Sequence, residues 1–87
     1  MRLREFKALM LCKLQALKAD LMKKYPDRAE RINQLTDLLV SKTYNLRVYT
    51  LSDYIFSLHL ASKEFEEFEK LIPTPEVVEE LIKEGEV

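Results

Sequence analysis

The sequence is poor in the residues that make turns and covalent cross-links. Its 87 residues include one glycine, three prolines, one cysteine, one histidine and no tryptophan. The scarcity of glycine and proline argues against turn-rich β-sandwiches and barrels and against glycine-rich phosphate loops. The single cysteine, Cys12, excludes an intramolecular disulfide and any Cys-x-x-Cys metal or redox spacing. A lone cysteine favours a reducing compartment, so we expect a cytoplasmic protein.

Long apolar segments are also missing. No run of about 18 apolar residues is present, which argues against a spanning helix. The basic N-terminal residues are not followed by an uninterrupted apolar stretch, so we expect no signal peptide. Hydrophobic residues make up 47% of the chain and charged residues 33%, a mixture typical of a globular protein. We therefore expect one globular domain over residues 1–87 and no membrane association.

The charges are unevenly distributed along the chain. Residues 1–48 hold eleven basic and five acidic residues, a net charge of +6, whereas residues 49–87 hold three basic and ten acidic residues, a net charge of −7. Such a chain can bind a polyanion with one half and a basic surface with the other. Alternatively, the two halves neutralise each other within the fold.

Apolar residues recur at steps of three and four, which is the period of an α-helix. In the first segment they are Leu3, Phe6, Met10, Leu14, Leu17 and Leu21. The sequence predicts an all-α fold, a small helical bundle of three main helices over about 2–24, 26–43 and 51–72, plus a short C-terminal helix over about 75–84. The predicted shared core is Leu14, Leu17, Leu35, Leu39, Leu58 and Phe65.

Catalytic and metal-binding patterns are absent from the sequence. His59 is the only histidine, and a zinc site needs three or four suitable ligands. A Cys12–His59 dyad would need one specific packing of two helices and still lacks an orienting group. The many glutamates have helical lysine neighbours, as in Glu66–Lys70 and Glu79–Lys83, which is typical of a solvated face. We expect no enzyme activity, no catalytic residue, no metal and no cofactor.

Four basic residues surround the junction of the first two helices and form a candidate nucleic-acid site, called here the basic corner. They are Lys23, Lys24, Arg28 and Arg31. Cations of this kind contact phosphates without reading bases. Nucleic-acid binding through phosphate contacts alone is therefore the second hypothesis, that of a small DNA- or RNA-binding protein.

The favoured hypothesis is a protein-interaction role, because two helices have more apolar residues than one core needs. Large exposed apolar patches are typical of protein interfaces. The predicted partner-binding residues are Leu11, Met22, Phe56 and Leu60, with Lys7 and Lys18 beside them. The expected partner is a larger protein or a second copy of the chain in a homo-oligomer.

In size and composition the chain is similar to small helical accessory subunits of nucleic-acid machines, a likeness that rests on no motif. From the surplus of apolar residues, and not from this likeness, we expect an accessory subunit that docks on a larger assembly, for example one that processes nucleic acid in DNA replication.

Overall fold

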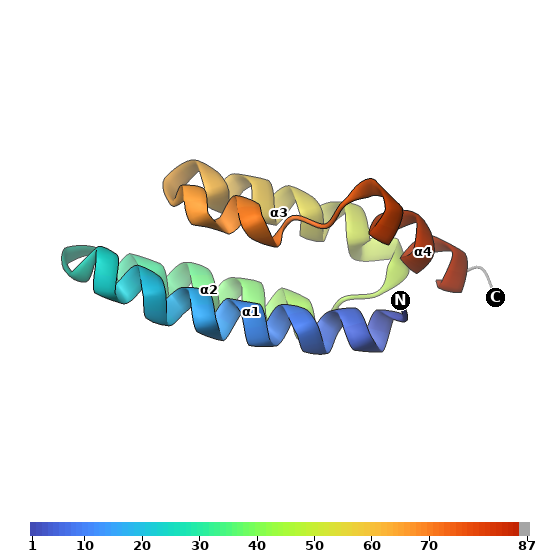
Figure 1. The fold of residues 1–87 in the computed structure, drawn as a ribbon, viewed down its shortest axis with the longest axis horizontal. Helices are drawn as coiled ribbons and strands as arrows, with labels where there is room; N and C mark the ends of the chain where they lie inside the picture. Colours follow the sequence, from blue (N-terminus) through green and yellow to red (C-terminus); the bar gives the residue numbers. More distant parts are fainter. Residues whose placement is uncertain (86–87) are drawn as a thin grey trace.

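The computed structural model describes residues 1–85, and these residues are helical almost throughout (Figure 1). They form four α-helices, α1 (Leu3–Lys24), α2 (Ala29–Tyr44), α3 (Leu51–Glu64) and α4 (Pro75–Gly85). Three short 3₁₀ helices join them, η1 (Pro26–Arg28), η2 (Val48–Thr50) and η3 (Glu66–Leu71). No β-strand occurs within residues 1–85. The predicted all-α bundle is confirmed.

Two helical hairpins make up most of the molecule. In Figure 1, α1 and α2 run side by side in opposite directions, and the hairpin formed by α3 and η3 lies above them. Helix α4 lies at the end where the chain begins, and the amino group of Met1 is 2.8 Å from the carboxylate of Glu80. The resulting shape is elongated, with extents of 46 × 20 × 16 Å.

The first hairpin follows the predicted helix limits closely. Helix α1 buries Phe6, Met10, Leu14 and Leu21, which are members of the predicted apolar stripe. The helix ends before Pro26, because a proline restricts the residue that precedes it and lacks the N–H that a continuing helix would use. The chain then makes the 3₁₀ turn η1 before α2 starts.

The predicted third helix over 51–72 is wrong after residue 64. Helix α3 ends at Glu64, Phe65 is extended with φ −133° and ψ 104°, and the chain reverses into η3. The reversal places the Phe65 ring beside the ring of Tyr25, with centroids 5.5 Å apart, and under the guanidinium of Arg28 at 4.5 Å. Contacts with a distant part of the chain therefore stabilise a break at a position that has no glycine or proline.

The 3₁₀ geometry of η3 also changes which side chains are buried. A 3₁₀ helix has three residues per turn, so residues three apart lie on one face. Phe65, Phe68 and Leu71 follow this spacing and are all buried. Leu71 would lie off the core in an α-helix that continued from α3, and it reaches the core because the helix type changes.

One hydrophobic core runs between the hairpins. Five of the six predicted core residues are buried and the sixth, Leu17, is partly buried and packs against them; the five are Leu14, Leu35, Leu39, Leu58 and Phe65. Within this core the Tyr54 hydroxyl lies 2.8 Å from the Thr43 hydroxyl, which donates a hydrogen bond to the Leu39 carbonyl. Since the Thr43 hydrogen is engaged, Tyr54 is the donor in this pair, and it joins α3 to α2.

Candidate docking site

Helices α2 and α3 lie side by side in opposite directions and are joined by ion pairs at both ends of their contact. Arg31, near the start of α2, binds Glu64 at the end of α3 through two hydrogen bonds of 2.7 and 2.8 Å. Lys42, near the end of α2, binds Oδ2 of Asp53 near the start of α3 at 3.0 Å. These two ion pairs limit the stretch over which the helices can present a shared surface.

A groove of about 430 Å³ lies between the two ion pairs and is mainly apolar. Its lining includes the buried residues Leu35, Leu39 and Ala61 and the exposed side chains of Leu38 and Leu60. A concave apolar surface with charged groups at its end is the usual form of a site that receives side chains of a partner.

Three large apolar side chains of α2 and α3 are exposed to solvent; Leu38 and Leu60 line the groove, and Phe56 precedes Leu60 on α3. Leu38 is 51% exposed, Leu60 is 48% exposed, and Phe56, one helical turn before Leu60, is 59% exposed. Each has buried neighbours on its own helix, so the exposure belongs to one face of the molecule and not to a loosely packed region. We name the face formed by Leu38, Phe56 and Leu60 the apolar rim.

At one end of the groove, the Arg31–Glu64 ion pair shifts the pKa of both of its members. The hydrogen bonds from Arg31 lower the pKa of Glu64 below its usual value, and the same contact raises the pKa of Arg31. Both side chains are well exposed, so this pair orients the helix ends more than it stabilises the fold.

The residues predicted for docking on α1 lie in a different environment. Leu11 and Met22 are partly buried, and Met22 packs against the core. The ammonium group of Lys7 donates to the Tyr44 carbonyl at 2.8 Å and to the Leu46 carbonyl at 3.4 Å, where α2 ends. Lys18 is partly buried. The partly buried Leu11 and Met22 on α1 thus differ from Phe56 and Leu60 on α3, whose side chains are exposed.

The basic corner has acidic and aromatic partners within the same molecule. Lys24 lies 3.0 Å from Glu67, Arg31 binds Glu64, and Arg28 covers the Phe65 ring. Lys23 is exposed and is absent from the ion pairs found within residues 1–85. The acidic half of the chain is therefore folded onto this part of the basic half, which leaves less cationic surface than the sequence suggests.

The structure adds little that points to catalysis or to metal binding. Cys12 is exposed on α1, and His59 is exposed on α3. Within residues 1–85, no three histidine, cysteine, aspartate or glutamate side chains are grouped so that they could hold a metal ion. None of the described helices has both the length and the apolarity needed to cross a membrane.

Leu38 is the residue of this site that sequence reasoning did not select. It lies on α2 close to Ile32, Leu35 and Leu39. Those three residues are buried, while Leu38 lies about 100° around the helix from Leu39 and remains exposed. In the sequence, the only indication of its exposure is that Leu38 lies beside an already complete apolar stripe, and it lines the groove only because α3 packs next to it.

Comparisons with protein-family models, with curated proteins and with solved structures found no match.

Proposed function

We propose that this protein is a non-catalytic interaction subunit, which binds a protein partner through the groove between α2 and α3. The observation that carries the proposal is the apolar rim, in which the half-exposed side chains of Leu38 and Leu60 line a groove with a buried leucine floor and the exposed Phe56 lies one helical turn before Leu60. Apolar patches of this kind on small proteins are often functional, because exposing them to water is unfavourable.

The charges around the groove support a docking role. The ion pairs Arg31–Glu64 and Lys42–Asp53 place polar groups at the two ends of an apolar centre. An apolar centre surrounded by polar groups is the usual arrangement of a protein interface, in which the apolar centre supplies affinity and the polar groups supply orientation. Direct nucleic-acid contact receives less support, since three of the four corner cations already have partners.

The experiment identifies the proteins that co-purify with the tagged chain from the cells that produce it naturally, and it compares the original chain with two variants. The test variant carries Leu38→Ser and Leu60→Ser, and the matched control carries Tyr49→Ser, which changes a side chain that is 87% exposed on η2, outside the residues that line the groove. We expect the double variant to lose its specific partner at least tenfold and the control to retain it. Circular dichroism confirms that both are folded. Retention of every partner by the folded double variant would overturn the proposal.

A further inference from the structure

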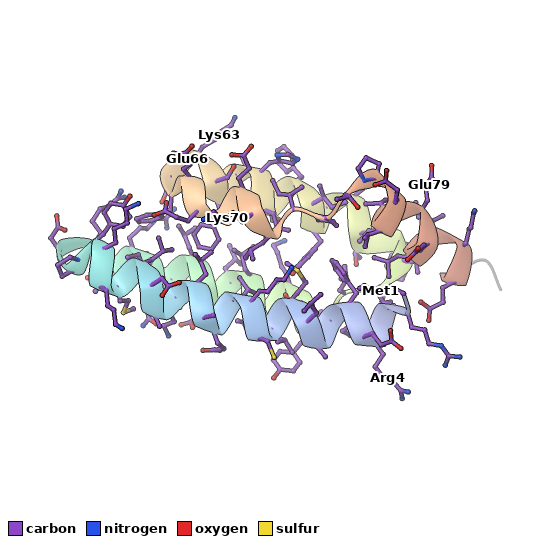
Figure 2. All side chains as sticks on the ribbon, viewed as in Figure 1. Met1, Arg4, Lys63, Glu66, Lys70 and Glu79 are labelled. Atoms are coloured by element: carbon purple, nitrogen blue, oxygen red, sulfur yellow. The ribbon has the colours of Figure 1, made fainter. Side chains whose placement is uncertain are left out.

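The exposed stripe of α3 carries an ordered set of four side chains. Asp53, Phe56, Leu60 and Lys63 follow one another at steps of three, four and three residues, so they lie on one face of the helix. All four are exposed, and Figure 2 shows Lys63 near the end of α3 with its side chain directed away from α1 and α2. The stripe therefore reads acid, aromatic, leucine, base.

This stripe is complementary to itself when its direction is reversed. The pair Asp53 and Lys63 and the pair Phe56 and Leu60 share one midpoint, residue 58. If two α3 helices pack antiparallel about that midpoint, the Asp53 carboxylate of each meets the Lys63 ammonium of the other. The same arrangement brings each Phe56 ring against the Leu60 of the other copy. A two-fold axis produces each of these contacts twice.

From this self-complementarity we infer that the occupant of the apolar rim is a second copy of this chain, in a two-fold symmetric dimer with α3 packed against α3. The inference rests on the proposed function, because it uses the same surface and names the partner. In the dimer the Phe56 ring of one copy enters the groove between Leu38 and Leu60 of the other.

Asp53 and Lys63, the two ends of the stripe, can each bind an opposite charge of a second copy. Asp53 binds Lys42 through Oδ2 alone and its side chain remains 67% exposed, so Oδ1 is free to accept from a second cation. Within residues 1–85, Lys63 takes part in none of the ion pairs. Because the area around three apolar side chains is small for an interface, we expect a dimer that dissociates on dilution.

The first measurement is the oligomeric state of the full chain. Sedimentation equilibrium over a wide concentration range is expected to show a reversible monomer–dimer equilibrium. A chain that stays monomeric at the highest concentration would overturn the inference. In that case the co-purification test with Leu38→Ser and Leu60→Ser still decides the proposed function, so the two can fail separately.

The second measurement uses charge reversal to identify the surface. In a homodimer of either D53K or K63D, both contacts join like charges, and we expect at least a tenfold weaker dimer. In an equimolar mixture of the two variants, both contacts of the mixed dimer join opposite charges, so dimerisation is expected to return. The double variant D53K/K63D is expected to dimerise by itself.

Matched controls separate this effect from net charge. D20K on α1 and K83D on α4 make the same charge changes at exposed positions outside the stripe, and we expect each to dimerise like the original chain. If D53K and K63D also dimerise normally, or if their mixture stays monomeric, the antiparallel α3 arrangement is wrong.

Discussion

The basic corner and the groove between α2 and α3 share the Arg31–Glu64 pair. Their other side chains differ, because most of those at the corner contact partners within the molecule and those beside the groove are exposed to solvent. At the corner, Lys24 and Arg28 find partners in Glu67 and the Phe65 ring. Along the groove, the apolar rim residues Leu38, Phe56 and Leu60 remain in water. A conspicuous charge cluster in a sequence can thus be internal to the fold, while a less conspicuous set of apolar residues is left for a partner.

Two phenylalanines in and beside α3 give the largest test of this difference. Phe65→Ala is expected to lower the free energy of unfolding by about 3–5 kcal/mol, because the buried ring loses its contacts and leaves a cavity. Phe56→Ala makes the same chemical change on the exposed face and is expected to change it by less than about 0.5 kcal/mol. Urea denaturation of dilute protein measures both. Equal losses would place Phe56 in the core and remove the apolar rim.

The hydrogen-bonded hydroxyl groups of Tyr54 and Thr43, which join α3 to α2, give the next largest effect. Tyr54→Phe removes the donor to Thr43 and is expected to cost about 1 kcal/mol of stability, whereas Tyr49→Phe on the surface is expected to cost nothing measurable. Thermal unfolding of both variants gives the comparison. An unchanged Tyr54→Phe variant would mean that this bond does not help to hold α2 and α3 together.

The raised pKa of Tyr54 leads us to expect that the folded protein loses stability at alkaline pH. Burial in the core between α2 and α3 raises the pKa of Tyr54 above its ordinary value. Its contribution is complete below the ordinary tyrosine pKa of about 10 and is lost as the pH rises through the raised value, because the unfolded chain ionises first. Unfolding followed between pH 8 and 12 should show this loss in the original chain and not in Tyr54→Phe.

A smaller effect is expected when the acidic partners of the basic corner are neutralised. Glu64→Gln with Glu67→Gln removes the charges that face Arg31 and Lys24, and retention on heparin is expected to need more salt for elution. The control, Glu76→Gln with Glu79→Gln on α4, makes the same change in net charge away from the corner. Equal shifts in the two double variants would show that the corner is not specifically masked.

The smallest effect concerns the acid side of the Arg31–Glu64 pair. Because Arg31 lowers the pKa of Glu64, the contribution of the pair is present above the ordinary glutamate pKa and is lost as the pH falls through the lowered value. The stability difference between the original chain and Arg31→Gln should therefore shrink as the pH falls from 7 to 3. Urea unfolding at several pH values measures this difference, and a constant difference would assign the effect of Arg31 to packing.

The sequence by itself determined the helices and most of the core. The stripe from Phe6 to Leu21 repeats with the period of the α-helix, and Pro26 and Pro75 mark helix starts by their own backbone chemistry. These signals are local, because periodicity and proline geometry act over a few neighbouring residues.

Only the tertiary structure decided where α3 ends and which off-stripe residues stay exposed. The break at Phe65 depends on Tyr25 and Arg28, which are about 40 residues earlier in the chain. The burial of Leu71 depends on the 3₁₀ helix that follows the break, and the exposure of Leu38 and Phe56 depends on how α2 and α3 are placed. Contacts between distant residues leave no periodic signal in a single sequence, because their energies arise only after the hairpins have packed together.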